Sequence, residues 1–221
     1  MGAAVLRKEF DALLGGHLDW QSRPEPERVP SGISELDVAT GGLPRGCLTE
    51  IFGPASSGRT SLLDSILAEA TARQEVCALV DAEDAFDPES AAEAGVRLER
   101  LLWVRCNHNP EQALKAADLL TQGGGFGLVA MDLGDNPAAR RISLTSWFRL
   151  RRAVEHTPTV LVTVARRSHA KTCASLLLEC AREQTAWSGA GPGRLMRGIR
   201  VRATSTHRSK ACSPVFMARA I

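Results

Sequence analysis

Residues 48–63 read LTEIFGPASSGRTSLL, and the order of residue types in this segment is the strongest indication of the fold class. It places a glycine-flanked loop, Gly53–Thr60, between an apolar strand (48–53) and a helix predicted over 61–73. The two glycines let the backbone curl so that successive N–H groups face one anion, and the helix N-terminus behind them adds its dipole. A phosphate-binding loop needs this strand–loop–helix context. Thr60 is then placed to ligate Mg²⁺, which predicts a site for ATP with magnesium.

The loop departs from the usual GxxxxGK[ST] pattern at one position, because Arg59 stands where lysine is expected. A guanidinium is planar and broad and holds its donors in a fixed fork, so it does not replace a compact ammonium conservatively. We expect poorer stabilisation of transition-state charge and hence weak hydrolysis. The sequence is compatible with two hypotheses about Gly53–Thr60. In one, the loop binds nucleotide without efficient turnover; in the other, it keeps its shape but binds nothing.

Two acidic residues support the nucleotide site. Asp132 ends the apolar strand 128–132, where a carboxylate can hold the metal through water. Glu83 follows the strand 76–81, where a carboxylate can orient or deprotonate an attacking water. Each would be an ordinary loop acid by itself, and their spacing from the loop favours a functional role.

Strands and helices alternate through most of the chain, which predicts an α/β fold with a mostly parallel central sheet flanked by helices. Apolar runs mark further strands at 101–106 and 159–164, and helical periodicity marks helices at 88–95, 110–122 and 139–156. Three consecutive strands (174–184, 197–205 and 214–220) are expected to be antiparallel at the sheet edge. A helix over 4–18 and a polar linker form the segment 1–28, and the core domain is predicted over 29–221.

Charge divides the chain. Residues 1–135 hold 11 Lys+Arg and 22 Asp+Glu, a net −11, whereas residues 136–221 hold 16 and 3, a net +13. A basic half indicates either contact with nucleic-acid phosphates or pairing with an acidic surface. The six scattered cysteines and the absence of a signal-peptide pattern favour a reducing cytoplasm and no membrane.

The basic half also carries aromatic side chains. Within the helix predicted over 139–156, Trp147 and Phe148 are expected to be core residues. Arg166 and Arg167 follow the strand 159–164, at a sheet end where ligands bind, and are predicted to contact DNA or a partner. Trp187 stands in a glycine-rich polar context and is a candidate exposed anchor for another protein.

Two stretches closely resemble the bacterial recombinase RecA: SGISELDVATGGLPRGCLTEIFGPASSGRTSLL (31–63) and CALVDAEDAFDPESAAEAGV (77–96). The resemblance implies that Glu83 takes the catalytic glutamate position and that Asp87 lies near the adenine. It also implies that Arg208 and Lys210 reach a neighbouring subunit's nucleotide. The residues that would contact phosphates are Gly53, Pro54, Ala55, Ser56, Ser57, Gly58, Arg59, Thr60 and Ser61.

The chain differs from RecA in ways that agree with one another. Val164 stands where RecA has a glutamine that senses the γ-phosphate. The first DNA-binding loop, after Asp132, is nearly gone, the second (166–171) is short, and no separate C-terminal domain is expected. In these features the chain is similar to the ImuA family of the bacterial DNA-damage (SOS) response.

That resemblance implies a cytoplasmic, nucleoid-associated accessory protein of translesion synthesis. Its implied partners are an inactive Y-family polymerase such as ImuB, RecA itself and, indirectly, an error-prone C-family polymerase, with non-specific DNA contact. Two alternatives are an active DNA-dependent ATPase or recombinase paralogue, and a SulA-like inhibitor that caps RecA filaments or the division machinery.

Overall fold

The computed structural model describes residues 25–188, 195–206 and 211–219. The helix predicted over 4–18 and the two predicted trans residues, Arg208 and Lys210, lie outside the described residues. No helix in the described part combines the length and the hydrophobicity that a membrane crossing requires.

A nine-stranded sheet organises the described residues, and its order is β10-β9-β8-β3-β7-β6-β4-β5, with β11 paired to β9. Neighbouring strands run parallel from β5 through to β8, and the antiparallel part begins at β9. The strands are β3 (Cys47–Phe52), β4 (Cys77–Asp81), β5 (Leu101–Arg105), β6 (Leu128–Asp132), β7 (Val160–Ala165), β8 (Leu176–Ser188), β9 (Leu195–Thr206), β10 (Ala211–Cys212) and β11 (Val215–Arg219). The predicted α/β fold with a mostly parallel sheet is confirmed.

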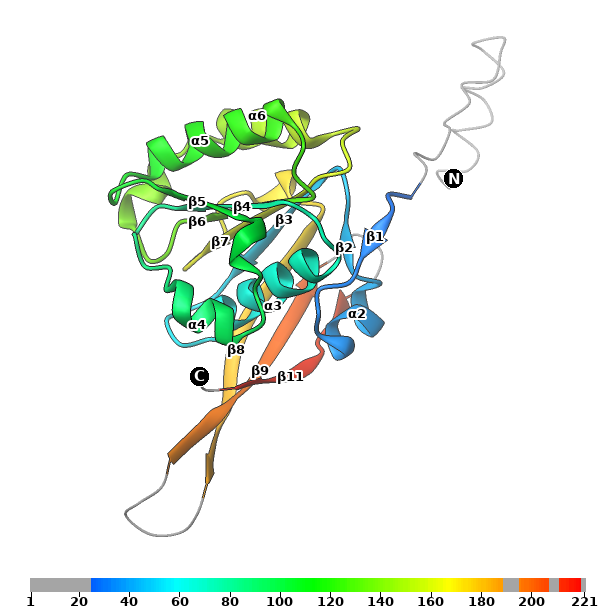
Figure 1. Ribbon diagram of the computed structural model, residues 1–221, viewed down its shortest axis with the longest axis vertical. Coiled ribbons are helices and arrows are strands. Elements are labelled where there is room, and N and C mark those ends of the chain that lie inside the picture. The colour runs from blue at the N-terminus through cyan, green and yellow to red at the C-terminus, as the bar shows by residue number, and fades with distance from the viewer. Residues whose placement is uncertain (1–24, 189–194, 207–210, 220–221) are drawn as a thin grey trace, which may run out of the picture.

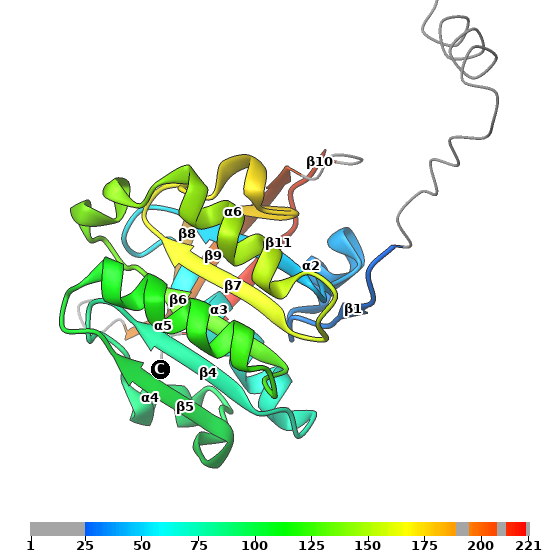
Figure 2. The same cartoon turned by 90° about the horizontal axis from the view of Figure 1, so that it is seen from above.

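Helices cover both faces of the sheet (Figure 1). Helices α3 (Arg59–Ala72) and α4 (Pro88–Glu93) lie on one face, and α5 (Pro110–Gly123) and α6 (Leu144–Val154) lie side by side on the other. Figure 2 shows α5 and α6 lying next to each other over the strands of the sheet. A short helix, α2 (Ser34–Thr40), and a two-stranded ribbon of β1 (Arg28–Val29) and β2 (Leu43–Pro44) lie beside this body.

Side chains from alternate strand positions fill two separate cores. Ile51, Leu79 and Val162 pack with α3 and α4, whereas Leu48 and Val80 pack with α5 and α6. This alternation follows from the period of two along a strand, and a sheet covered on both faces favours apolar residues at most positions.

The basic helix predicted over 139–156 is two elements, a 3-10 turn (Pro137–Arg141) and then α6. Ser143 separates them because its side chain accepts a hydrogen bond from the N–H of Ser146 and so caps α6. Trp147 is 1% exposed, as predicted, but the prediction that Phe148 is core was wrong, because that side chain is 43% exposed. Adjacent helix positions differ by about 100° in direction, and only Trp147 faces the sheet.

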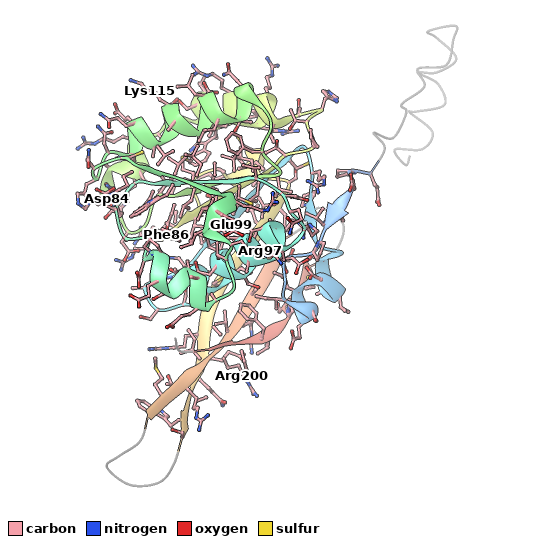
Figure 3. All side chains as sticks on the ribbon, in the orientation of Figure 1. Asp84, Phe86, Arg97, Glu99, Lys115 and Arg200 are labelled. Atoms are coloured by element: carbon pink, nitrogen blue, oxygen red, sulfur yellow. The ribbon has the colours of Figure 1, made fainter. Side chains whose placement is uncertain are left out.

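The C-terminal strands differ from their predicted arrangement at one point. β8 runs parallel to β3, from Thr49 opposite Leu176 to Phe52 opposite Glu179, so it extends the parallel sheet before β9 turns back. The outer parts of β8 and β9 form a ribbon that projects beyond the body (Figure 1). Arg200 points outward from this ribbon (Figure 3), and Trp187 is 54% exposed on it.

Candidate nucleotide-binding site

The loop between β3 and α3 requires glycine at both ends, for reasons that lie in distant strands. Gly58 has φ +88°, and a Cβ there would come within 2.3 Å of Val201 Cγ2 on β9. A Cβ on Gly53 would come within 2.3 Å of the carbonyl oxygen of Cys180 on β8. The β8–β9 pair therefore supports the phosphate loop from behind and holds it against the start of α3.

Arg59 lies within this loop and does not extend into solvent; its side chain is 11% exposed. Its Nη1 donates to the carbonyl oxygen of Gly53 at 2.7 Å, and its Nη2 donates to Asp135 Oδ1 at 2.5 Å. Asp135, in the connection after β6, was not among the predicted site residues. The sequence offered only one indication that Asp135 could belong to the site, namely that it is an acid three residues after Asp132.

The rest of the loop fits a phosphate group. Pro54, Ala55, Ser56 and Thr60 are exposed, whereas the hydroxyl of Ser57 is buried without a hydrogen-bond partner. A buried polar atom left unpaired usually indicates an absent ligand or water. The loop leads into the N-terminus of a 14-residue helix, whose free N–H groups favour an anion.

The two predicted acids stand at the adjacent ends of β4 and β6. Asp132 Oδ1 accepts a hydrogen bond from the N–H of Gly134 at 2.8 Å, and Glu83 Oε1 accepts one from Asn136 Nδ2 at 2.6 Å. Desolvation by burial, with further contributions from Asp81 and Glu83, raises the pKa of Asp132 to about 6. Asp132 remains suited to a metal ion, because a bound cation favours the charged carboxylate.

Asp64 on α3 forms part of the same acidic group, although the sequence reading did not single it out. Desolvation and, second, the charge of Asp132 raise the pKa of Asp64 to about 6. Because this pKa lies above the ordinary value of 3.8, ionisation of Asp64 destabilises the folded state. That penalty is absent below about pH 4, where the carboxyl is protonated in both states, grows as the pH rises from about 4 to about 6, and is constant above that range.

We therefore expect Asp64→Asn to raise the free energy of unfolding by about 1–3 kcal/mol at pH 8. The gain should stay constant from pH 8 to about 6 and then shrink as the pH is lowered toward 4, because the carboxyl of the unfolded chain is then protonated as well. Urea unfolding across this pH range measures it, with the exposed Glu99→Gln as a control that should show no such trend. A difference in the free energy of unfolding between wild type and Asp64→Asn that does not change with pH would contradict a raised pKa of Asp64.

Two further acids have structural partners. The buried Asp81 accepts hydrogen bonds from the N–H groups of Glu83 and Phe86, and so shapes the turn that carries Glu83. Asp84 and Phe86 of this turn lie at one end of the sheet (Figure 3). Asp87, expected near the adenine, caps α4; hydrogen bonds from Ser90 and from the N–H of Glu89 lower its pKa.

Arg166 and Arg167 line a cavity of about 320 Å³ beside the phosphate loop, which we call the arginine pocket. Its other lining residues are Gly134, Asp135, Asn136, Pro137, Arg140 and His169. Val164, expected at the sensor position, is buried within β7, and the strand continues to Ala165. The side chain that leaves the end of β7 toward the site is therefore that of Arg166, which lies 3.9 Å from Asp135 Oδ2.

One buried acid holds the connection that follows β7. Glu50, 1% exposed in β3, accepts hydrogen bonds from the hydroxyl of Ser168 and the N–H groups of His169, Ala170 and Lys171, at 2.5–3.3 Å. The sequence shows Glu50 only as an acid inside an apolar strand and does not indicate these hydrogen-bond partners. This carboxylate fixes the backbone of a segment that was predicted to be a short DNA-binding loop.

Comparison with known proteins agrees with this geometry. Residues 11–138 match the RecA N-terminal domain. Among curated proteins, the chain is 44% identical to Protein RecA of Chloroflexus aurantiacus over 113 residues, which is 50% of this chain and 32% of that protein. It is 45% identical to Protein RecA of Ectopseudomonas oleovorans over 106 residues (47% and 30%) and 42% identical to that of Frankia casuarinae over 131 residues (58% and 38%). The matched part spans about a third of the length of these relatives. The chain belongs to the RecA N-terminal domain family.

Proposed function

We propose that this protein is a RecA-like accessory factor of damage-induced translesion synthesis that binds ATP with Mg²⁺ but hydrolyses it little. The observation that carries the proposal is the position of Arg59, whose guanidinium is held between the Gly53 carbonyl and Asp135. A nucleotide phosphate can meet this arginine at the loop. A planar guanidinium drawn back to the Gly53 carbonyl is poorly placed to follow charge as it develops during phosphoryl transfer.

The other groups have matching roles in this proposal. The backbone N–H groups of the loop would hold the phosphates, and Thr60 and Asp132 would hold the magnesium ion, which would neutralise phosphate charge when bound. Asn136 occupies Oε1 of Glu83, which leaves Oε2 as the oxygen that could accept a proton from water. Weak turnover then follows from the position of Arg59.

The connections after β6 and β7 support an accessory role over strand exchange. Only residues 133–136 separate β6 from the next helical turn, and the connection after β7 is fastened to Glu50. DNA contact is then limited to backbone phosphates at the arginine pocket, independent of sequence and strongly weakened by salt.

The partners follow from the similarity to the ImuA family: an inactive Y-family polymerase such as ImuB, RecA, and through them an error-prone C-family polymerase. Trp187 and Met196 are opposed on the β8–β9 ribbon and are 54% and 49% exposed, which offers an apolar anchor for a protein partner. The segment 1–24 supplies a second candidate contact.

The proposal predicts two results for the same preparation. Purified protein should turn over ATP at least about a hundredfold more slowly than RecA, with no stimulation by single-stranded DNA, because the arginine is restrained. Tagged protein recovered from bacteria with damaged DNA should carry ImuB or RecA. Turnover is measured by phosphate release and capture by mass spectrometry.

Two variants test whether recovery of the partner depends on the two candidate contacts. Trp187→Ala with Met196→Ala, and deletion of 1–24, should each leave the core folded, and at least one should reduce recovery of the partner. DNA-stimulated turnover at the rate of RecA would instead favour the recombinase alternative. Recovery of division proteins without ImuB or RecA would favour the inhibitor alternative.

A further inference from the structure

The carboxylate of Asp135 lies where it can act on the phosphate loop directly. Its Oδ1 accepts the 2.5 Å hydrogen bond from Arg59 Nη2, and its Oδ2 lies 3.9 Å from Arg166 Nη1. One carboxylate thus bridges the arginine of the loop and the arginine that leaves β7. We propose that Asp135 is an internal anion of the phosphate loop, which neutralises Arg59 in the free protein, and that a nucleotide phosphate binds by displacing it.

The chemistry of the two anions supports an exchange. Carboxylate and phosphate oxygens both accept charge-assisted hydrogen bonds from the guanidinium fork, so they compete for the same donors. Arg59 is the first residue of α3, and its head is drawn back to the carbonyl of Gly53 at the start of the loop. Arg59 thus links Asp135 to the end of the loop where a phosphate would be held by N–H groups.

The backbone around Asp135 is fixed on both sides, so the bridge is not a chance contact of a free side chain. On one side, the N–H of Gly134 donates to Asp132 Oδ1, and the carbonyl of Gly134 accepts from the N–H of Arg166 at 2.9 Å. On the other side, Asn136 donates through Nδ2 to Glu83 and to the carbonyl of His108. The turn therefore presents Asp135 to the loop.

Exposure makes displacement feasible. The side chain of Asp135 is 38% exposed and that of Arg166 is 56% exposed, so a released carboxylate regains water and can stay near Arg166. Without Asp135, Arg59, which is 11% exposed, would lose its ion pair and keep only the longer-range charge of Asp132. Asp135 thus stabilises the empty loop and opposes nucleotide binding at the same time.

This inference rests on the proposed binding of ATP, and Asp135→Asn tests it. The amide keeps the shape of the side chain and removes its charge. Titration calorimetry with Mg²⁺–ATP and with tripolyphosphate should show about tenfold tighter binding for Asp135→Asn than for wild type, which corresponds to losing one charge-assisted competitor. Glu99→Gln removes the same charge from an exposed site and should change binding less than twofold.

A double-mutant cycle separates the specific bridge from general electrostatics. In the Arg59→Ala background, Asp135→Asn should improve binding less than twofold, because the competing contact is already gone. A tenfold gain in both backgrounds, or no gain with intact Arg59 while wild type binds ATP, overturns the role of Asp135 and leaves the proposed binding of ATP standing. If neither wild type nor Asp135→Asn binds ATP or tripolyphosphate, the proposed function falls and this inference falls with it.

Discussion

Replacing Glu50 by alanine is expected to lower the free energy of unfolding by about 3–5 kcal/mol. The carboxylate is buried and accepts hydrogen bonds from one hydroxyl and three backbone N–H groups of the connection after β7. Alanine removes all four bonds and leaves the buried N–H of Ala170 without an acceptor, whereas the three partly buried donors can recover only part of the loss from water. Urea unfolding followed by circular dichroism measures the loss.

Two other variants show whether the acceptor itself is responsible. Glu50→Gln should lose less stability than Glu50→Ala, because the side-chain oxygen of glutamine still accepts hydrogen bonds. It should still be less stable than wild type, because the amide nitrogen cannot accept from the N–H groups that it faces. Glu93→Ala removes an exposed acid and should change the free energy of unfolding by less than about 0.5 kcal/mol. A loss below about 1 kcal/mol for Glu50→Ala would show that the connection after β7 holds its form without this carboxylate.

The second large effect is expected at Gly58. Alanine there meets two obstacles: φ is +88°, which L-residues rarely adopt, and its Cβ would stand 2.3 Å from Val201 Cγ2. We expect a loss of about 2–4 kcal/mol in the free energy of unfolding and at least a tenfold loss of nucleotide affinity. Both losses share one cause, a phosphate loop pushed away from β9.

The steric and conformational parts can be separated. Adding Val201→Ala to Gly58→Ala removes the clash but not the strained φ, so it should restore part of the lost stability. Gly123→Ala, at the end of α5 where an added Cβ meets nothing within 4 Å, serves as the matched glycine control and should be neutral or slightly stabilising. Equal stability of Gly58→Ala and Gly123→Ala would refute the proposed packing of β9 on the loop.

The strands and most helices could be predicted because their signals are local. Apolar runs, helical periodicity and the glycines of Gly53–Thr60 lie within a few residues of the elements they specify, and the sheet confirmed them. The predictions failed where the local signal does not decide the outcome. Phe148 shares its apolar character with Trp147, and only the orientation of α6 on the sheet decides which of the two is buried.

By itself, the sequence determined the α/β class, the strand–loop–helix that carries Arg59, and the placing of Glu83 and Asp132 after neighbouring strands. The tertiary structure alone decided what surrounds them: Val201 behind Gly58, Glu50 beneath residues 168–171, and Asp135 against Arg59. These pairs are separated by 76 to 143 residues in the chain. A periodic pattern predicts on which face of a helix or strand a residue lies, because that depends on its near neighbours in the chain. It does not record which distant side chain will meet it, because that depends on the order in which the strands join the sheet.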